Sequence, residues 1–407
     1  MMTEEIVKCM KCGFCRAVCP IFSELKTEPY SPRGRLQLIK NLVKGAVHFS
    51  PKWHNPIFRC LICKACVEEC PSGVELDRLF ISARAEEVKD KSLSLGKKVV
   101  FRYFMRARRM FPFSVIILGI LQRITLLSWR FSPARLFFPL LGMPMGRSIP
   151  TFTLKPFLSR NPEVVPAKGE RRMRVAFFVG CATNYIYPNI GASLVDVLTK
   201  LSVEVVIPKG QMCCGTPLYI SGDIEGARYL AQRNIDIFSS LDVDYIVSAC
   251  ASCGLSLKRE WNRILGLEWD SSRVRDISEL LLELGLPEGL PEFSQKLTYH
   301  DPCHLRRGQK IWLEPRKILQ EVAGENFIEM READRCCGGA GSFNLFYYET
   351  SRAVGERKKE NILESKAEAV ATGCPSCIMQ LKSILPKRIK VLHPVEIIDE
   401  LLKKKKQ

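Results

Sequence analysis

The chain has 407 residues, enough for two or three domains with sizeable buried cores. It carries 61 lysines and arginines against 43 acidic residues, a formal net charge of +18, and 18 cysteines. The first residues, Met1 to Ile6, show no basic stretch followed by an apolar one, so we expect no secretory signal. Because the cysteines fall into metal-ligand spacings, we expect a reducing, cytoplasmic compartment rather than a disulfide framework.

Two copies of one cysteine pattern stand near the start of the chain. In each copy, Cys-x2-Cys-x2-Cys-x3-Cys is followed by proline, which is the spacing of bacterial ferredoxins with two cubane [4Fe–4S] clusters. The fourth cysteine of each run binds the cluster of the other run. The predicted ligands are Cys9, Cys12, Cys15 and Cys70 for cluster 1, and Cys60, Cys63, Cys66 and Cys19 for cluster 2. A zinc or disulfide knot is the alternative, but zinc normally takes two separated pairs of ligands.

Residues 1–95 are predicted to form a small α-helical dicluster ferredoxin-type domain. Ser31-Pro32 is typical of a helix start, and residues 76–88 have helical periodicity.

Residues 96–171 are predicted to form a basic, apolar, helical connector. Residues 91–161 contain thirteen lysines and arginines, many aromatic residues and no Asp or Glu. This composition favours contact of residues 96–160 with anionic lipid or a membrane subunit, at the inner face of the cytoplasmic membrane. The longest mainly apolar run, 111–121, is too short to span a bilayer. Packing on the protein's own core is the second possibility; without a recognition fold we expect no nucleic-acid partner.

From about residue 172, short apolar strands alternate with helices. The predicted strands are 175–179, 203–207, 245–248, 297–300, 326–329 and 369–372, and the predicted helices are 225–239, 277–281 and 395–398. The series occurs twice, since equivalent cysteines are separated by 122, 123 and 124 residues. This internal duplication predicts two α/β domains, 172–290 and 291–407.

Each repeat places a cysteine, a Cys-Cys-Gly and a Cys-x2-Cys after predicted strands. The sets are Cys181, Cys213, Cys214, Cys250 and Cys253, and then Cys303, Cys336, Cys337, Cys374 and Cys377. Because strand carboxyl ends meet at one edge of an α/β sheet, we expect five thiols to converge in each repeat. Gly215, Gly338 and Gly339 would let the backbone approach closely. Zinc, or buried free thiols in one degenerate repeat, are the alternatives to a cluster.

The repeated pattern resembles the CCG domain. Two ferredoxin runs followed by two CCG domains are similar to the iron–sulfur subunits of glycolate oxidase and D-lactate dehydrogenases, and heterodisulfide reductase D-type subunits share the layout. Ser31-Pro32-Arg33-Gly34-Arg35 and Cys70-Pro71-Ser72-Gly73-Val74 look more like the glycolate oxidase branch. In the heterodisulfide reductase relatives, CCG domains bind non-cubane [4Fe–4S] clusters with all five cysteines. The resemblance therefore implies one or two such clusters here, in a multidomain α+β fold.

The resemblance implies an iron–sulfur electron-transfer subunit of a membrane-associated oxidoreductase. Electrons would pass from a flavoprotein subunit that oxidises glycolate or D-lactate to a quinone or other acceptor, with a quinone- or haem-bearing membrane subunit as a further partner. No dinucleotide fingerprint is present, so we expect any flavin on another chain. The alternative is a catalytic subunit that cleaves a disulfide at a non-cubane cluster. A nucleic-acid-binding redox regulator is a third class, for which four cluster sites are excessive.

Two histidines flank the first cysteine of the second repeat. His300 and His304 would tune or ligate a cluster, since imidazole can replace thiolate, or they are loop histidines with ordinary hydrogen bonds. Asp301 and Arg306 are expected to orient this loop.

Overall fold

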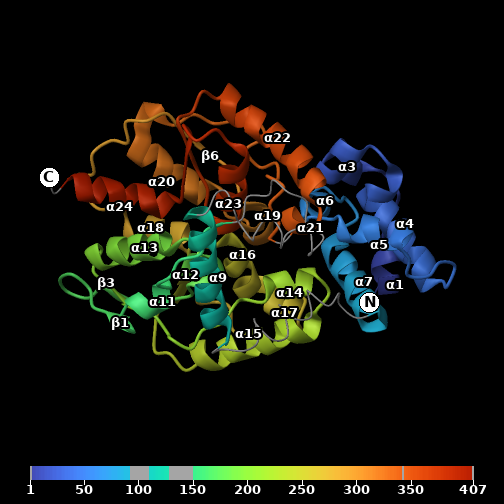
Figure 1. The fold of residues 1–407 in the computed structure, drawn as a ribbon, viewed down its shortest axis with the longest axis horizontal. Helices are drawn as coiled ribbons and strands as arrows, with labels where there is room; N and C mark the ends of the chain where they lie inside the picture. The colour runs from blue at the N-terminus through green and yellow to red at the C-terminus, as the bar shows by residue number, and fades with distance from the viewer. Residues whose placement is uncertain (1, 92–109, 128–149, 342, 406–407) are drawn as a thin grey trace.

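The computed structural model describes residues 2–91, 110–127, 150–341 and 343–405. The N-terminal helices lie at one end of the molecule, beside two α/β units that follow in the chain (Figure 1). These helices are α1 (Met2–Val7), α2 (Phe14–Ala17), α3 (Pro20–Leu25), η1 (Glu28–Tyr30), α4 (Pro32–Val43), α5 (Pro51–Phe58), α6 (Ala65–Glu68) and α7 (Leu76–Lys91).

The start of α4 agrees with the sequence expectation. The Ser31 hydroxyl accepts a hydrogen bond from the Gly34 N–H at 2.9 Å and so caps the helix. A Cβ at Gly34 would lie 1.9 Å from the Glu28 carbonyl oxygen, so this turn accepts only glycine.

The first α/β unit has a five-stranded sheet in the order β1-β3-β2-β4-β5, parallel except for β1, which pairs antiparallel with β3. Its strands are β1 (Val164–Val165), β2 (Met173–Phe177), β3 (Val203–Val206), β4 (Tyr245–Ser248) and β5 (Val274–Asp276). Its helices are α12 (Gly180–Tyr185), α13 (Pro188–Lys200), α14 (Thr216–Ile220), α15 (Ile224–Phe238), α16 (Ala251–Leu255), the π-helical turn η3 (Ser256–Glu260), α17 (Trp261–Arg263) and α18 (Ile277–Leu284).

The second unit repeats this order with a smaller parallel sheet, β6-β7-β8. Its elements are β6 (Leu297–Tyr299), α19 (Cys303–Gln309), α20 (Leu313–Ala323), η4 (Gly324–Asn326), α21 (Phe343–Phe346), α22 (Tyr348–Glu364), β7 (Ala369–Ala371), α23 (Pro375–Ile384), β8 (Lys390–Leu392) and α24 (Pro394–Lys404).

The predicted strand 326–329 is wrong. Its first residue, Asn326, belongs to the 3-10 turn η4, and within the predicted strand only Phe327 forms a β-bridge, to Leu297 of the sheet. The short strands β5 and β8 were not predicted. Each has only three residues directly before a helix, too few for a period-two pattern to stand out.

The two units pack against each other in a reciprocal way, because a helix of one unit contacts the helix of the other unit that is not its counterpart. Helix α13 of the first unit packs on α24 of the second, and α18 of the first packs on α20 of the second. One hydrophobic core continues across both pairs. At the cysteine loops, the Ala251 N–H donates to the Gly373 carbonyl oxygen at 3.1 Å, so the edges that carry the thiols meet.

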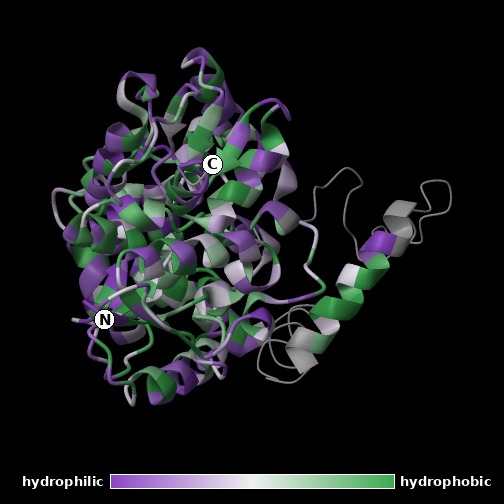
Figure 2. Ribbon diagram, turned by 90° about the vertical axis from the view of Figure 1, so that its left-hand side faces the viewer, coloured by the Kyte–Doolittle hydropathy of each residue, from purple (hydrophilic) through white to green (hydrophobic). Residues whose placement is uncertain are grey.

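Much of the predicted connector, residues 92–109 and 128–149, lies outside the described residues. Helix α9 (Met110–Leu127) stands apart from the body and is largely hydrophobic in Figure 2. Gln122 and Arg123 tie it to the Pro150 and Phe152 carbonyls, each at 3.1 Å. In contrast, α11 (Phe157–Arg160) buries Phe157 in the first unit, so internal packing holds for this part of the connector. Among the described residues, no helix is long and apolar enough to cross a bilayer.

Candidate metal centres

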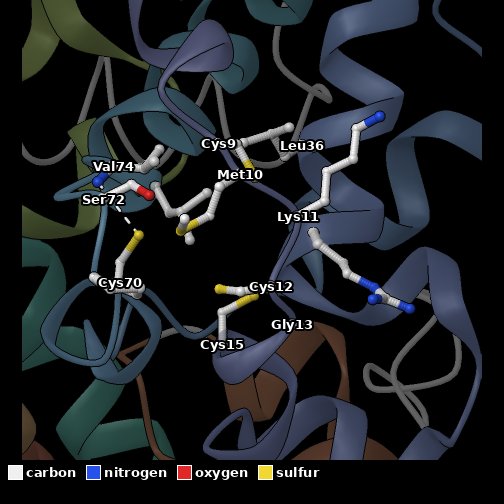
Figure 3. A pocket seen from close by; sticks show the side chains of 13 residues that line it. Cys9, Met10, Lys11, Cys12, Gly13, Cys15, Leu36, Cys70, Ser72 and Val74 are labelled. Carbon is white, nitrogen blue, oxygen red and sulfur yellow. Dashed lines mark hydrogen bonds between the residues drawn. The ribbon is translucent and has the colours of Figure 1, made fainter.

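The first pocket of the N-terminal domain brings together four thiols from both ferredoxin-type runs. Cys9, Cys12, Cys15 and Cys70 line it, and their side chains face a common space (Figure 3). The Val74 N–H donates to the Cys70 sulfur at 3.4 Å. Burial raises the pKa of the Cys15 thiol to about 11, so metal binding there must displace a proton. The predicted crossing of Cys70 to the first run is therefore the arrangement found in this pocket.

The second pocket combines Cys19 with Cys60, Cys63 and Cys66. Arg35 and Arg84 are buried close by. Arg35 donates to the Pro56 carbonyl at 2.7 Å, and its Nη1 lies 4.0 Å from the Cys19 sulfur.

Arg84 donates to the Ile57, Cys60 and Ile220 carbonyls at 2.6–2.8 Å, and burial lowers its pKa to about 10. A buried cation bonded to neutral carbonyls is costly unless an anion is near. A cluster held by four thiolates supplies such negative charge, so the residues around this pocket fit a [4Fe–4S] cluster.

The five thiols of the first repeat converge at the ends of its parallel strands. Cys181 and Cys213 have sulfurs 3.9 Å apart. Hydrogen bonds to Cys213 and Cys253 lower the pKa of Cys214 well below its usual value, and Cys253 bonds in turn to Cys250. Gly180 makes room for this set, because a Cβ there would lie 2.8 Å from the Cys253 sulfur.

The second repeat has the same arrangement. Hydrogen bonds to Cys303 and Cys337 lower the pKa of Cys336. Cys377 bonds to both Cys337 and Cys374. All five predicted cysteines of each repeat therefore come together, which is the chemistry of a thiolate-rich metal site.

The two sets are joined to each other and to the N-terminal domain. Cys250 and Cys374 lie close enough to shift each other's pKa, so the two thiol sets meet at the boundary between the repeats. Cys63 and Cys336 lie in one buried cluster, and their charges act on each other. Sequence spacing did not predict either junction, since both depend on how the domains pack.

The two histidines of the second repeat have different environments. His304 is engaged at both nitrogens, with Ser252 Oγ at 3.0 Å and the Ile62 carbonyl at 3.3 Å, so it joins three parts of the chain. His300 donates from Nδ1 to the Ala333 carbonyl at 3.2 Å, while its buried Nε2 has no hydrogen-bond partner among the residues that the structure describes. Burial lowers the pKa of His300 to about 4, so the ring is neutral.

One ring nitrogen of His300 and the sulfurs of Cys337 and Cys377 lie within 4.8 Å of one another, a geometry suited to a metal ion. The predicted role of Asp301 and Arg306 agrees with their ion pair at 3.2 Å. Arg316 also binds both oxygens of Asp301 at 2.8 Å, a contact that the sequence did not indicate.

A buried ionic cluster fastens the second ferredoxin-type loop to the first repeat. Lys64 and Arg263 both contact Asp77 and Glu260, whose side chains are 2% exposed. Arg263 also reaches Glu75 at 2.8 Å. Burial alone would raise the pKa of Asp77, but Lys64 and Arg263 hold it below its usual value. This cluster positions the loop that carries Cys63 and Cys66.

Comparisons with known proteins agree with this organisation. Residues 5–74 match a family described as a 4Fe-4S dicluster domain, and residues 175–258 and 297–382 each match a cysteine-rich domain. The chain is 32% identical over 394 residues to a probable glycolate oxidase iron-sulfur subunit of Bacillus subtilis, covering 93% of this chain and 88% of that protein.

Two further relatives also align over most of their length. The glycolate oxidase iron-sulfur subunit of Escherichia coli is 28% identical, over 97% of this chain and 94% of its own. The D-type subunit of a dihydromethanophenazine:CoB–CoM heterodisulfide reductase from Methanosarcina acetivorans is 23% identical, over 92% and 87%. The dicluster domain and the cysteine-rich domains support the binding of 4Fe-4S clusters. The chain therefore belongs to the family of iron–sulfur oxidoreductase subunits that includes the glycolate oxidase iron-sulfur subunits.

Proposed function

We propose that this chain is an electron relay with four [4Fe–4S] clusters, one in each cysteine set. Its two ferredoxin-type sites hold cubane clusters and its two repeats hold non-cubane clusters. The clusters supply one-electron chemistry, while the chain sets their spacing and surroundings. The observation that carries the proposal is the series of interacting thiols from Cys181 to Cys303. Cys250 and Cys374 act on each other across the two repeats, and Cys336 and Cys63 do so across the boundary to the ferredoxin-type domain.

The domain junctions support one order for the proposed relay. Cluster 1 would lie outermost, beside the exposed Cys12. Cluster 2 follows, and Cys63 places it next to the second repeat. The first repeat is reached through Cys374 and Cys250. In this series of thiols the second repeat therefore lies between cluster 2 and the first repeat.

The printed functions of the relatives suggest the partners. An iron–sulfur subunit of a glycolate oxidase works with a dehydrogenase subunit, so we assign this chain a flavoprotein partner that oxidises glycolate or D-lactate. The acceptor would be a quinone or a haem-bearing membrane subunit.

Helix α9 is the part of the chain that we assign to the inner face of the cytoplasmic membrane. Phe113, Ile117, Leu118, Ile120 and Leu121 are between 42% and 63% exposed. The surrounding residues 91–161 bring thirteen basic side chains and no acidic ones, which complements the negative charge of anionic lipid.

Cleavage of a disulfide at a cluster is the second candidate, supported by the heterodisulfide reductase relative and by one feature of the site. The series of thiols ends at Cys181, which is partly exposed. A substrate-facing cluster needs such an open end, whereas a relay cluster does not.

Anaerobic co-purification through a tag on this chain, followed by cofactor extraction, separates the two. The relay predicts a stoichiometric flavoprotein and bleaching of the iron–sulfur absorbance on addition of glycolate or D-lactate. Absence of flavin, together with oxidation of a reduced viologen by a thiol heterodisulfide, would contradict the relay and support disulfide cleavage.

A further inference from the structure

Lys358 on α22 is a buried lysine beside the thiols of the second repeat. Its ammonium group donates to the backbone carbonyls of Glu332 and Ala333, the latter at 3.1 Å. The thiols of Cys336 and Cys337 follow this loop in the chain, and their charges act on Lys358. Burial lowers the pKa of Lys358 to about 8, so the group still carries its proton at pH 7.

The charge on Lys358 is not neutralised by a carboxylate in contact with it among the described residues. Two acidic side chains act on it electrostatically, Asp301 and Asp334. Both already pair with arginines, Asp301 with Arg316 at 2.8 Å and Asp334 with Arg307 at 2.6 Å. The ammonium is therefore available to stabilise negative charge on the neighbouring thiol set.

The first repeat has a neutral residue at this position. Helices α15 and α22 begin 124 residues apart, and this offset places Asn234 where the second repeat has Lys358. The Asn234 amide accepts from the Met212 N–H at 2.8 Å and donates to the Cys213 carbonyl at 3.2 Å. Both residues thus anchor the loop that leads to the Cys-Cys pair, but only Lys358 brings a charge.

A second difference lies beside the first, since His300 and Lys358 both donate to the Ala333 carbonyl. Phe178 and His300 occupy equivalent positions, since the N–H of each donates at 2.9 Å to a strand carbonyl, that of Val247 or of Ala371. The first repeat therefore has an apolar ring where the second has a neutral imidazole whose unpartnered Nε2 is buried near two sulfurs. This nitrogen carries no positive charge, so the Lys358 ammonium is the group of this pair that favours an added electron at the second repeat.

We infer that Lys358 makes the second cysteine set the more easily reduced of the two, an inference that rests on the proposed binding of a cluster in each repeat. Reduction adds one electron and hence one negative charge at the thiolate set. A buried ammonium stabilises this charge more strongly than it would in water, because the interior screens poorly. An electron that arrives from the ferredoxin-type domain through the Cys63 junction therefore resides at the second repeat before it reaches the first.

The test is an EPR-monitored redox titration of the anaerobically purified full-length protein. The signal that Cys377→Ser removes is assigned to the second repeat. Lys358→Met is expected to lower the equilibrium constant for reduction of this centre at least tenfold, which lowers its midpoint potential by about 59 mV for one electron. The potential of the first repeat's signal should not change. His300→Phe, which copies the first repeat and removes no charge, is expected to shift the potential of this signal much less than Lys358→Met. Lys359→Gln, one residue further, removes a partly exposed charge that pairs with Glu356 and should shift neither signal.

A Lys358→Met protein with wild-type iron content and an unchanged potential would overturn the inference. Lys358→Arg keeps the charge, so it should retain the wild-type potential. A shift as large as that of Lys358→Met would show that packing rather than charge sets the potential, and would also overturn the inference. If Cys377→Ser removes neither iron nor a signal, the second repeat holds no cluster. In that case the proposed relay fails together with the inference, and the two failures are distinguishable by iron content.

Discussion

Replacing Arg263 with glutamine tests the ionic cluster that fastens the Cys63 loop to the first repeat. Wild-type Lys64 and Arg263 share Asp77 and Glu260, both 2% exposed, and Arg263 also binds Glu75. Without Arg263, two buried carboxylates are left to a single ammonium. Breaking a buried ion pair from one side costs about 3–5 kcal/mol. Because the Arg263 side chain retains some exposure, we expect a value near the lower end, about 3 kcal/mol.

A second variant shows whether charge is the cause. Glu260→Gln added to Arg263→Gln leaves one buried carboxylate with one ammonium, so the double variant should recover about 1–2 kcal/mol relative to Arg263→Gln alone. Lys89→Gln is the matched control, since it breaks the pair with Glu86 on α7, whose side chains are 73% and 45% exposed, and should cost under about 0.5 kcal/mol.

The assay is anaerobic guanidinium unfolding, followed by circular dichroism and by iron–sulfur absorbance. The change in midpoint is converted to free energy with a common slope. Arg263→Gln should also lose the iron of the second ferredoxin-type site at lower denaturant than the wild type. A loss below about 1 kcal/mol, or a double variant at least as unstable as Arg263→Gln, would refute the reasoning.

Three further predictions follow from single positions. Gly180→Ala should lower the iron content per chain, because the new Cβ would lie 2.8 Å from the Cys253 sulfur in the first repeat. Gly266→Ala is the control, since it imposes the same positive-φ strain where no atom lies nearby, and it should keep the wild-type iron content. Ile117→Glu should weaken co-sedimentation with anionic vesicles at least tenfold, and equal binding of both proteins would argue against α9 as the contact. Burial lowers the pKa of His393 from 6.5 to about 4, so between these pH values the unfolded chain binds a proton that the folded chain does not. The contribution of His393 to stability is therefore full above pH 6.5, and the free energy of unfolding should fall by up to about 3 kcal/mol towards pH 4. Thermal unfolding of His393→Asn should depend less on pH, and parallel curves for the two proteins would exclude this residue as the source.

The convergence of the thiols was predictable from the sequence, because the cysteines have the spacings of cluster-binding loops. The duplication was predictable as well, since five cysteines keep nearly constant offsets. Most strands were found from short, mainly apolar runs of four or five residues. The predicted strand at 326–329 failed because local turn formation at Gly324, with φ 48°, competes with pairing to the sheet.

Contacts between domains were not predictable in this way. The Cys250–Cys374 contact, the Lys64–Arg263 cluster and the buried Arg84 depend on which surfaces pack, and no periodic pattern reports this. The sequence could have indicated Lys358 as a point where the repeats differ, because aligning them at an offset of 124 places this lysine opposite Asn234. A charged residue opposite a neutral one in an otherwise matching internal repeat is a useful marker of divergence between two sites.

The most direct test of the four-cluster relay is a count of iron together with EPR of the reduced protein, purified without oxygen. Four four-iron clusters predict about sixteen iron atoms per chain, and the Cys63–Cys336 junction predicts magnetic coupling between cluster 2 and the second repeat. Cys377→Ser should lose about four irons and this coupling together. A wild-type chain with about eight irons, and with the ten thiols of the repeats free to react, would contradict the relay.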